Sequence, residues 1–278
     1  MLGMLEEKKT SIVEDFQEYF EVELATTAEQ MAKVYHIRYR VYCEEFGYEE
    51  AESFPDDQES DEFDSHSVHC LIIHKLTGMP AACVRVVNVD QHTLMPMEKY
   101  CRNSLDNDLF GSRSLNRSVI CEFSRLAVDG AFRRRVGEGA SRFGELSSMD
   151  CTKRELRTFS LIAIAAFVSA FAISDHLGRP HAFAMMEPFL PRLLKRSGVL
   201  VSRVGEDVDY HGIRAPYFIT TPAAVGGMPD ELRELYHAIH LQFSGSPIFG
   251  HGRKVGRTSV PPLEIKAWQW NDPALVFT

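Results

Sequence analysis

The segment "SVICEFSRLAVD", residues 118–129, combines the composition of a buried strand with two charged side chains. Its apolar and β-branched residues predict the fourth strand of a sheet. Regular alternation predicts two faces, with Glu122, Ser124 and Leu126 on one and Phe123, Arg125 and Ala127 on the other. A charge in such a strand costs free energy unless it is paired. Glu122 is therefore either an edge residue or part of a site.

Upstream of this strand, the sequence predicts three more strands. "FEVELA" (20–25) alternates between apolar and polar residues, and the pair "HSVHCLIIHK" (66–75) and "PAACVRVVNV" (80–89) is joined by the short turn "LTG". Strand 80–89 contains Arg85, a second buried-strand arginine. Two strand arginines and a strand glutamate predict an internal ion-pair network, which is either structural or the base of a polar site.

Between the first two strands lie a predicted helix and an acidic segment. The helix, 26–47, opens with a threonine cap and Glu29 in a capping-box pattern and ends at Gly47. From Glu44 to Asp64 there are eleven carboxylates and no lysine or arginine. By composition alone this segment is a solvated loop.

Downstream, the periodicity predicts helices and strands in alternation. Residues 91–117 are irregular, and 130–154, rich in Gly, Arg and Ser, predict a loop. The remaining predicted elements are a long helix at 156–178, a strand at 181–186, a helix at 187–198, strands at 199–205 and 215–221, and a helix at 229–243. The order predicts a mixed α/β sheet with helices on both faces.

Composition narrows the class of protein. The net charge of −9 argues against a general nucleic-acid partner, because phosphate binding needs a basic face. The six cysteines form no CxxC pair, and the isolated histidines form no metal-binding set, so we expect no metal and a reducing, cytoplasmic compartment. The apolar run 159–173 is shorter than the roughly 20 residues of a membrane span and predicts a buried helix. The N-terminus lacks the pattern of a signal peptide.

Four motifs in this order resemble one family of enzymes. "IRYRVYCEEFGY" (37–48), "DEFDSHSVH" (61–69), "CVRVV" (83–87) and "CEFSRLAV" (121–128) are similar to the acyl-homoserine-lactone synthases and the long-chain N-acyl amino acid synthases. These enzymes are variants of the GNAT acyltransferase fold. The run from "MEP" to "YFI" (186–219) resembles one branch, the PEP-CTERM/exosortase-associated acyltransferases. The resemblance covers roughly residues 20–222.

This resemblance implies an α/β, GNAT-like fold with a mixed, mostly antiparallel sheet. It implies that residues 1–222 form the acyltransferase domain, with residues 223–278 as a C-terminal helix and tail packed on it. The implied reaction moves a fatty acyl group from an acyl carrier protein thioester, less favourably from coenzyme A, to the amine of an amino acid. The alternatives are an acyl-homoserine-lactone synthase that uses S-adenosylmethionine and a non-catalytic lipid- or partner-binding module. Tyr48, where the lactone synthases carry tryptophan, favours the amino acid synthases.

The resemblance also places candidate site residues. It assigns Glu122 and Arg125 to catalysis, with Glu122 as the base, because burial raises a carboxylate pKa toward that of an amine. It implies that Asp61 and Asp64 point inward from a turn just before a strand that begins near Val68. The acids from Glu44 to Glu59 are expected to face solvent. The substrate-binding residues implied are Arg38, Tyr42, Tyr48, Asp61, Asp64 and Arg85.

Two further features complete the predicted site. The arginine-rich segment has two competing interpretations. In one, Arg133, Arg134 and Arg135 form a basic patch for an acidic acyl carrier protein, the donor that the resemblance implies. In the other, "RRVGEG" (134–139) is the RxxGxG phosphate loop of coenzyme A enzymes. Small residues on the long helix leave room for an acyl chain, with Met186, Phe189 and Leu190 on the other side of the slot. These small residues are Ala163, Ala165, Ala166, Ser169 and Ala170.

Overall fold

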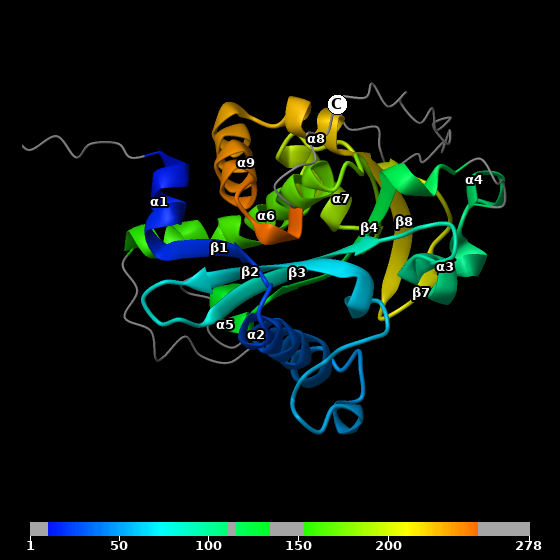
Figure 1. Cartoon of the computed structure of the whole chain (residues 1–278), viewed down its shortest axis with the longest axis horizontal. Helices are drawn as coiled ribbons and strands as arrows, with labels where there is room; N and C mark the ends of the chain where they lie inside the picture. The colour runs from blue at the N-terminus through cyan, green and yellow to red at the C-terminus, as the bar shows by residue number, and fades with distance from the viewer. Residues whose placement is uncertain (1–10, 111–114, 134–152, 250–278) are drawn as a thin grey trace, which may run out of the picture.

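A computed structural model describes residues 11–110, 115–133 and 153–249. Within them, one twisted sheet runs in the order β1-β2-β3-β4-β5-β8-β6, with β7 paired to β8 (Figure 1). All neighbouring strands are antiparallel except β4 and β5, which are parallel. The strands are β1 (Phe20–Leu24), β2 (Ser67–His74), β3 (Pro80–Asn88), β4 (Ile120–Val128), β5 (His181–Met186), β6 (Ser202–Arg203), β7 (Val208–Asp209) and β8 (Ile213–Thr220).

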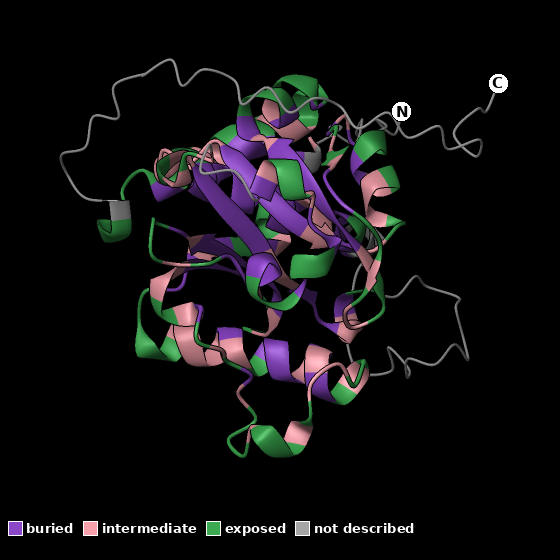
Figure 2. Ribbon diagram, turned by 90° about the vertical axis from the view of Figure 1, so that its right-hand side faces the viewer, coloured by how far each residue is buried: buried purple, intermediate pink, exposed green. Residues whose placement is uncertain are grey.

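Helices cover both faces of this sheet, and buried residues concentrate between them (Figures 1 and 2). One face packs on α1 (Ile12–Tyr19), α6 (Lys153–His176) and α9 (Asp230–Phe243), and the other carries α2 (Ala28–Tyr39). The alternation of β3 explains the two cores, since Val84 packs toward α6 and Cys83 toward α2. The shorter helices are α3 (Pro96–Tyr100), α4 (Asn107–Phe110), α5 (Gly130–Arg133), α7 (Leu190–Arg196) and α8 (Thr221–Gly227).

Most predicted strands and the long helices are confirmed, but the predicted strand 199–205 is reduced to the two residues of β6, and the sequence did not predict β7 or α8. Several details of the prediction are also wrong. The capping box of α2 pairs Thr27 with Gln30 rather than using Glu29. Helix α1, which the sequence did not predict, begins with its own capping box between Ser11 and Glu14. Short helices α3 and α4 interrupt the segment predicted to be irregular, and α5 occupies the start of the predicted loop 130–154. Residues 134–152 of that loop lie outside the described structure.

Helix α6 is the buried helix that the apolar run predicts. The segment Thr158–His176 is 19 residues long and apolar enough to cross a membrane, yet 78% of its most apolar window is buried inside the protein. Its apolar side chains lie between the sheet and α9. The prediction of a core helix is therefore confirmed.

The centre of the sheet opens between β4 and β5. These strands pair only from Ile120 to Glu122 on β4, opposite His181 to Phe183 on β5. Beyond Glu122, β4 continues to Val128 with a partner on its β3 side only. The β5-facing edge of β4 is therefore open beyond Glu122, and no described strand pairs with its backbone N–H and C=O groups there.

A β-bulge reshapes the same part of β4. Cys83 pairs with Ala127 and Arg85 with Ser124, so Arg125 and Leu126 together oppose a single β3 residue. Arg125 has a φ of 49°, in the left-handed region that non-glycine residues rarely adopt. The predicted alternation is consequently wrong at Arg125. Its side chain pairs with Asp61, as does that of Arg85. Arg85 also donates to Ser124, which was predicted to lie on the opposite face from Arg125.

Candidate active site

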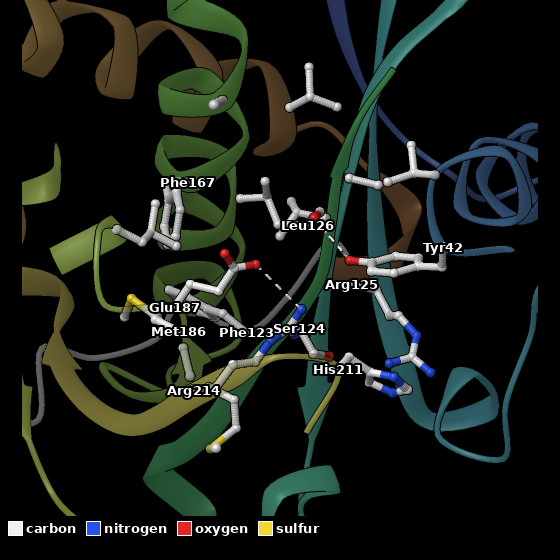
Figure 3. Close-up of a pocket in the computed structure, with 18 of the residues that line it drawn as sticks. Tyr42, Phe123, Ser124, Arg125, Leu126, Phe167, Met186, Glu187, His211 and Arg214 are labelled. Carbon is white, nitrogen blue, oxygen red and sulfur yellow. Dashed lines mark hydrogen bonds and ion pairs between the residues drawn. The ribbon is translucent and has the colours of Figure 1, made fainter. Parts of the chain in front are cut away.

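A cavity of about 900 Å³ opens where β4 and β5 separate (Figure 3). Its apolar end lies against α6, where Phe159, Ala163 and Phe167 line it. Its polar end includes Tyr42, Arg125, Tyr210, His211 and Arg214. Figure 3 shows this division, with Phe167 and Met186 on one side and Tyr42, Arg125 and His211 on the other. The volume lies in the upper part of the ~300–1,000 Å³ range of small-molecule sites.

Glu122 lies in the cavity wall at the last residue where β4 pairs with β5. Its side chain is 2% exposed, and the Met97 backbone N–H donates to its Oε2 at 3.0 Å. Burial raises the pKa of Glu122 from 4.5 to about 8, against the smaller opposing effect of that hydrogen bond. A carboxylate of this kind exchanges a proton with an amine near neutral pH.

Behind the cavity, charged side chains form a buried network between α2 and the sheet. Its members are Arg38, Glu59, Asp61, Asp64 and Arg85. Arg38, 0% exposed, donates through Nε to Glu59 and through Nη1 to Asp64 at 2.7 Å. Arg85, also 0% exposed, donates through Nη1 to the same Asp64 oxygen at 2.7 Å. Burial raises the pKa of Asp64, but both guanidiniums outweigh it and hold that pKa well below its usual range. Asp64 is therefore ionised and joins the helix to β3.

Arg125 links this network to the cavity. Its guanidinium lies 3.1 Å from Glu59, 3.2 Å from Asp61 and 3.2 Å from Glu49. Its Cζ atom lies 5.4 Å from the centre of the Tyr42 ring. The strained backbone of Arg125 is thus held by three carboxylates and one aromatic ring, in keeping with the storage of strain at functional sites.

Tyr42 is placed by a change of helix type. After α2, residues Arg40–Glu45 form a π-helical turn, and such turns are frequent at functional sites. The Tyr42 hydroxyl donates to the Leu126 carbonyl at 2.9 Å, in the bulge of β4. Burial raises the pKa of Tyr42 to about 12, so the hydroxyl keeps its proton and acts as a donor.

The structure separates the predicted site residues into two groups. Four of them line the cavity: Glu122, Arg125, Tyr42 and Arg133. The other five described ones, Arg38, Arg85, Asp61, Asp64 and Tyr48, lie behind its wall, where the first four join the ion-pair network. Arg134, Arg135 and the RxxGxG segment 134–139 lie outside the described residues. Asp61 and Asp64 sit at a 3₁₀ turn, Asp64–His66, directly before β2, as predicted.

The prediction for Glu59 is wrong. It belongs to the stretch predicted to face solvent, yet it is 1% exposed and bonded to Arg38 and Arg125. Burial raises the pKa of Glu59, and the two guanidiniums outweigh that effect and lower it. One signal in the sequence pointed this way: if Glu122 stays unpaired as the base, the three arginines Arg38, Arg85 and Arg125 outnumber the two inward acids that remain.

Two other cavity residues were missed or undervalued. Arg214, on β8, has no distinguishing sequence context but lines the cavity. His211 sits in the turn between β7 and β8 with a φ of 54°, and its Nε2 lies 3.4 Å from Glu49. Chain folding at β8 therefore adds two basic side chains to the polar end. Among the described residues, no group of three or more His, Cys, Asp or Glu side chains is arranged to hold a metal ion.

The predicted acyl slot is only partly formed as expected. Ala163 lines the cavity, as do Met186, Phe189 and Leu190 on its other side. The remaining small residues of α6 pack in the core instead, and this part of the prediction is wrong. These core residues are Ala165, Ala166, Ser169 and Ala170, all 0% exposed.

The mixed, mostly antiparallel sheet with helices on both faces is the arrangement of the GNAT-like fold. Residues 37–140 match the model of the acetyltransferase (GNAT) domain, which confirms the predicted fold class. The chain thus has a GNAT-like fold. No curated protein matches this sequence.

Solved structures with the same fold include two kinds of synthase. The acyl-homoserine lactone synthase LasI shares 18% identity and a TM-score of 0.51, covering 76% of this chain and 97% of its own. BjaI, a CoA-dependent acyl-homoserine lactone synthase solved with SAM and isopentyl-CoA, shares 15% with a TM-score of 0.53, covering 80% and 89%. FeeM, an N-acyl amino acid synthase from uncultured soil microbes, shares 12% with a TM-score of 0.50, covering 75% and 94%. At these identities the likeness concerns the fold.

Proposed function

We propose that this protein transfers an acyl group from a phosphopantetheine thioester to the amine of an amino acid. The observation that carries the proposal is Glu122, a buried carboxylate whose raised pKa suits proton exchange with an amine, in the wall of a largely apolar cavity. The GNAT domain supports acyl transfer as the reaction class. The similar structure of the CoA-dependent synthase BjaI makes CoA a candidate donor, and the carrier-protein donor rests on the sequence resemblance.

In the proposed reaction, Glu122 removes a proton from the acceptor ammonium, directly or through water. The free amine attacks the thioester carbonyl carbon, a C–N bond forms, and the C–S bond breaks. The nitrogen loses its second proton to the departing thiolate, which leaves as the thiol. Glu122 passes the first proton to solvent and returns to its ionised form. No covalent enzyme intermediate is required.

The open edge of β4 supports the binding of a pantetheine arm. Beyond Glu122 this edge has no described β5 partner, so the backbone groups there that do not already bond to Tyr42 or Arg133 can pair with an extended chain of amides. The apolar end of the cavity, against α6, would then receive the acyl chain. Its volume favours a long chain over an acetyl group.

The donor and the branch of the family are parts of the same proposal. Arg133, at the cavity beside α5, is the described member of the basic patch proposed to meet an acidic carrier protein. The proposed assignment of residues 186–219 to the PEP-CTERM/exosortase-associated branch rests on sequence resemblance. Five cysteines of the described chain are buried and free, which suits a reducing, cytoplasmic compartment.

The test incubates purified protein with acyl carrier protein thioesters and acyl-CoAs of graded length and with a panel of amino acids. Mass spectrometry should detect an N-acyl amino acid with the wild-type protein and none with Glu122→Gln. Absence of an acylated product from every donor would reject acyl transfer and favour a lipid- or partner-binding module. Consumption of S-adenosylmethionine with lactone formation would instead identify an acyl-homoserine-lactone synthase.

A further inference from the structure

An amino acid acceptor brings a carboxylate into the site, and most nearby arginines have no capacity to bind it. Arg38 and Arg85 are fully buried behind the cavity and share Asp64. Arg125 contacts three carboxylates of the protein. Arg133 pairs with Glu45 and donates through Nε to the Val128 carbonyl at 2.8 Å. Each of these guanidiniums is already neutralised by the chain itself.

Arg38 and Arg85 each have a buried Nη2 without a hydrogen-bond partner among the described residues, but both lie behind the cavity wall. Arg214, in contrast, lines the cavity. Its Nε is buried and has no hydrogen-bond partner among the described residues. Its Nη2 lies 3.6 Å from an oxygen of Glu187, which is too long for a normal hydrogen bond. Nε and Nη2 share one edge of the planar guanidinium, the edge on which a carboxylate accepts two parallel hydrogen bonds. The edge that suits a carboxylate is thus the edge that the protein leaves open.

The guanidinium is also held in position. Its Cζ atom lies 5.3 Å from the centre of the Tyr48 ring, a distance that allows cation–π attraction. Tyr48 in turn stacks on Phe46 with a centroid distance of 5.1 Å. Figure 3 shows Arg214 extending from β8 into the cavity, with its guanidinium directed toward Glu187. The Arg214 side chain is 16% exposed, so water competes only partly for its donors.

Burial makes an unpaired edge of this kind selective. A buried guanidinium N–H without a partner costs free energy that a bound carboxylate recovers. An acceptor that lacks the carboxylate leaves the same donors unpaired, and such sites discriminate strongly against the analogue without the matching group. Arg214 and Glu122 line one cavity, so a small molecule there has a basic group for its amine and a cation for its acid.

We propose that Arg214 binds the carboxylate of the acceptor through its Nε–Nη2 edge and thereby restricts the acceptor to amines that carry a carboxylate. This assignment rests on the proposed acyl transfer to an amine. In it, Arg85 and Arg38 hold the fold of the site, Glu122 handles the proton, and Arg214 selects the substrate. Tyr48 acts as a positioning residue behind Arg214.

The experiment compares each amino acid acceptor with its carboxamide, which keeps the amine and loses the charge. KM values are measured for wild type, Arg214→Gln, Arg214→Lys and the control Arg203→Gln, whose arginine lies on the neighbouring strand β6 outside the cavity lining. Arg214→Gln should raise KM for the amino acid about 10- to 100-fold and leave KM for the carboxamide nearly unchanged. Arg214→Lys should recover part of the loss, and Arg203→Gln should resemble wild type.

Titration calorimetry of the amino acid gives a readout that is independent of turnover. Wild type should bind the amino acid more tightly than the carboxamide, and Arg214→Gln should lose that difference while its melting curve stays cooperative. An equal loss of affinity for the amino acid and for its carboxamide in Arg214→Gln would overturn the assignment. A rise in KM for the donor alone would also overturn it, because Arg214 would then contact the donor phosphate. If wild type forms no product but binds the amino acid through Arg214, acyl transfer fails and the carboxylate site stands.

Discussion

At the scale of single residues, two buried glutamates show how neighbouring charge decides protonation. Glu122 has no ion-pair partner among the described residues, and burial raises its pKa to about 8. Glu59 is equally buried, but Arg38 and Arg125 outweigh burial and lower its pKa. One glutamate is therefore suited to exchanging protons and the other to holding two arginines in place.

The pKa of Glu122 predicts the pH dependence of turnover. Because the ionised carboxylate is the base, kcat/KM should rise with pH and level off above about 8. Glu122→Gln should abolish this turnover at every pH, since an amide accepts no proton. Stopped-time assays between pH 6 and 9 would measure the profile, and turnover by Glu122→Gln that approaches the wild-type rate would remove Glu122 from the mechanism.

The same residue predicts a pH dependence of stability with a definite sign. Between the ordinary pKa of 4.5 and the folded pKa of about 8, the folded protein holds a proton that the unfolded chain releases. The contribution of Glu122 to the free energy of unfolding is then largest below pH 4.5 and falls by up to about 1.4 kcal/mol per pH unit across this window. Glu122→Gln should remove that slope. Denaturant midpoints of the two proteins at several pH values would show it, and parallel curves would contradict the raised pKa.

Loss of Glu59 should affect the fold rather than one chemical step. Glu59→Gln keeps a single amide oxygen, so only one of Arg38 and Arg125 retains an acceptor there, and the negative charge between the two guanidiniums is lost in a buried setting. We expect a loss of about 3–5 kcal/mol in the free energy of unfolding. Glu52→Gln, on the same acidic segment but exposed, should change stability little. Similar unfolding midpoints for the two variants would show that Glu59 does not carry the network.

At the scale of elements, the site is made by departures from regular structure. The π-helical turn after α2 places Tyr42, the bulge in β4 turns Arg125, and the early separation of β4 from β5 opens the cavity. Each departure leaves neighbouring elements well packed, with α6 closing the far side. The cavity therefore lies between rigid elements, and its length along α6 should limit the acyl chain.

Enlarging Ala163 tests that limit. Ala163→Phe places a ring at the apolar end of the cavity, so we expect a shift toward shorter acyl donors with little effect on acceptor KM. Chain-length profiles measured with graded thioesters would detect the shift. Ala165→Phe is the matched comparison, because Ala165 is 0% exposed in the core and its replacement should destabilise the fold instead. An unchanged length profile in a folded Ala163→Phe protein would place the acyl chain elsewhere.

At the scale of the whole molecule, the C-terminal helix completes the main core. Buried residues of α9 include Leu235, Tyr236, Ile239 and Phe243, and the helix packs on α6. The Gln242 side chain also donates to the Val22 carbonyl of β1, which connects the two ends of the described chain. We therefore expect α9 to unfold together with the GNAT sheet in one transition.

Truncation of Phe243 measures this coupling. Phe243→Ala should lower the free energy of unfolding by about 3–5 kcal/mol, because it leaves a cavity between α9 and the main core. Leu241→Ala, at a position that is 75% exposed on the same helix, should have little effect. Chemical denaturation followed by circular dichroism would compare them. Separate transitions, or equal effects of the two substitutions, would show that α9 is an independent element.

Local pattern was sufficient for much of the fold. Strands such as β2, β3 and β5 and helices such as α6 and α9 were predicted because their apolar periodicity extends over many residues. Helix α1 and the short helices between β3 and β4 were missed because short segments carry little periodic signal. The bulge at Arg125 was missed because it depends on pairing with β3, and the alternation rule assumes a regular strand.

Local sequence pattern was enough to predict the order of the main strands and long helices, the burial of α6, and the acids and arginines in unusually apolar strands. Only the tertiary structure decided which charges meet: it drew Glu59 into the core, placed Arg38 and Arg85 behind the cavity, and brought Arg214 from β8 to the cavity of Glu122. The reason is physical. Apolar periodicity is a local property, whereas the state of a buried charge depends on its neighbours in space, and those come from elements as far apart as α2 and β8.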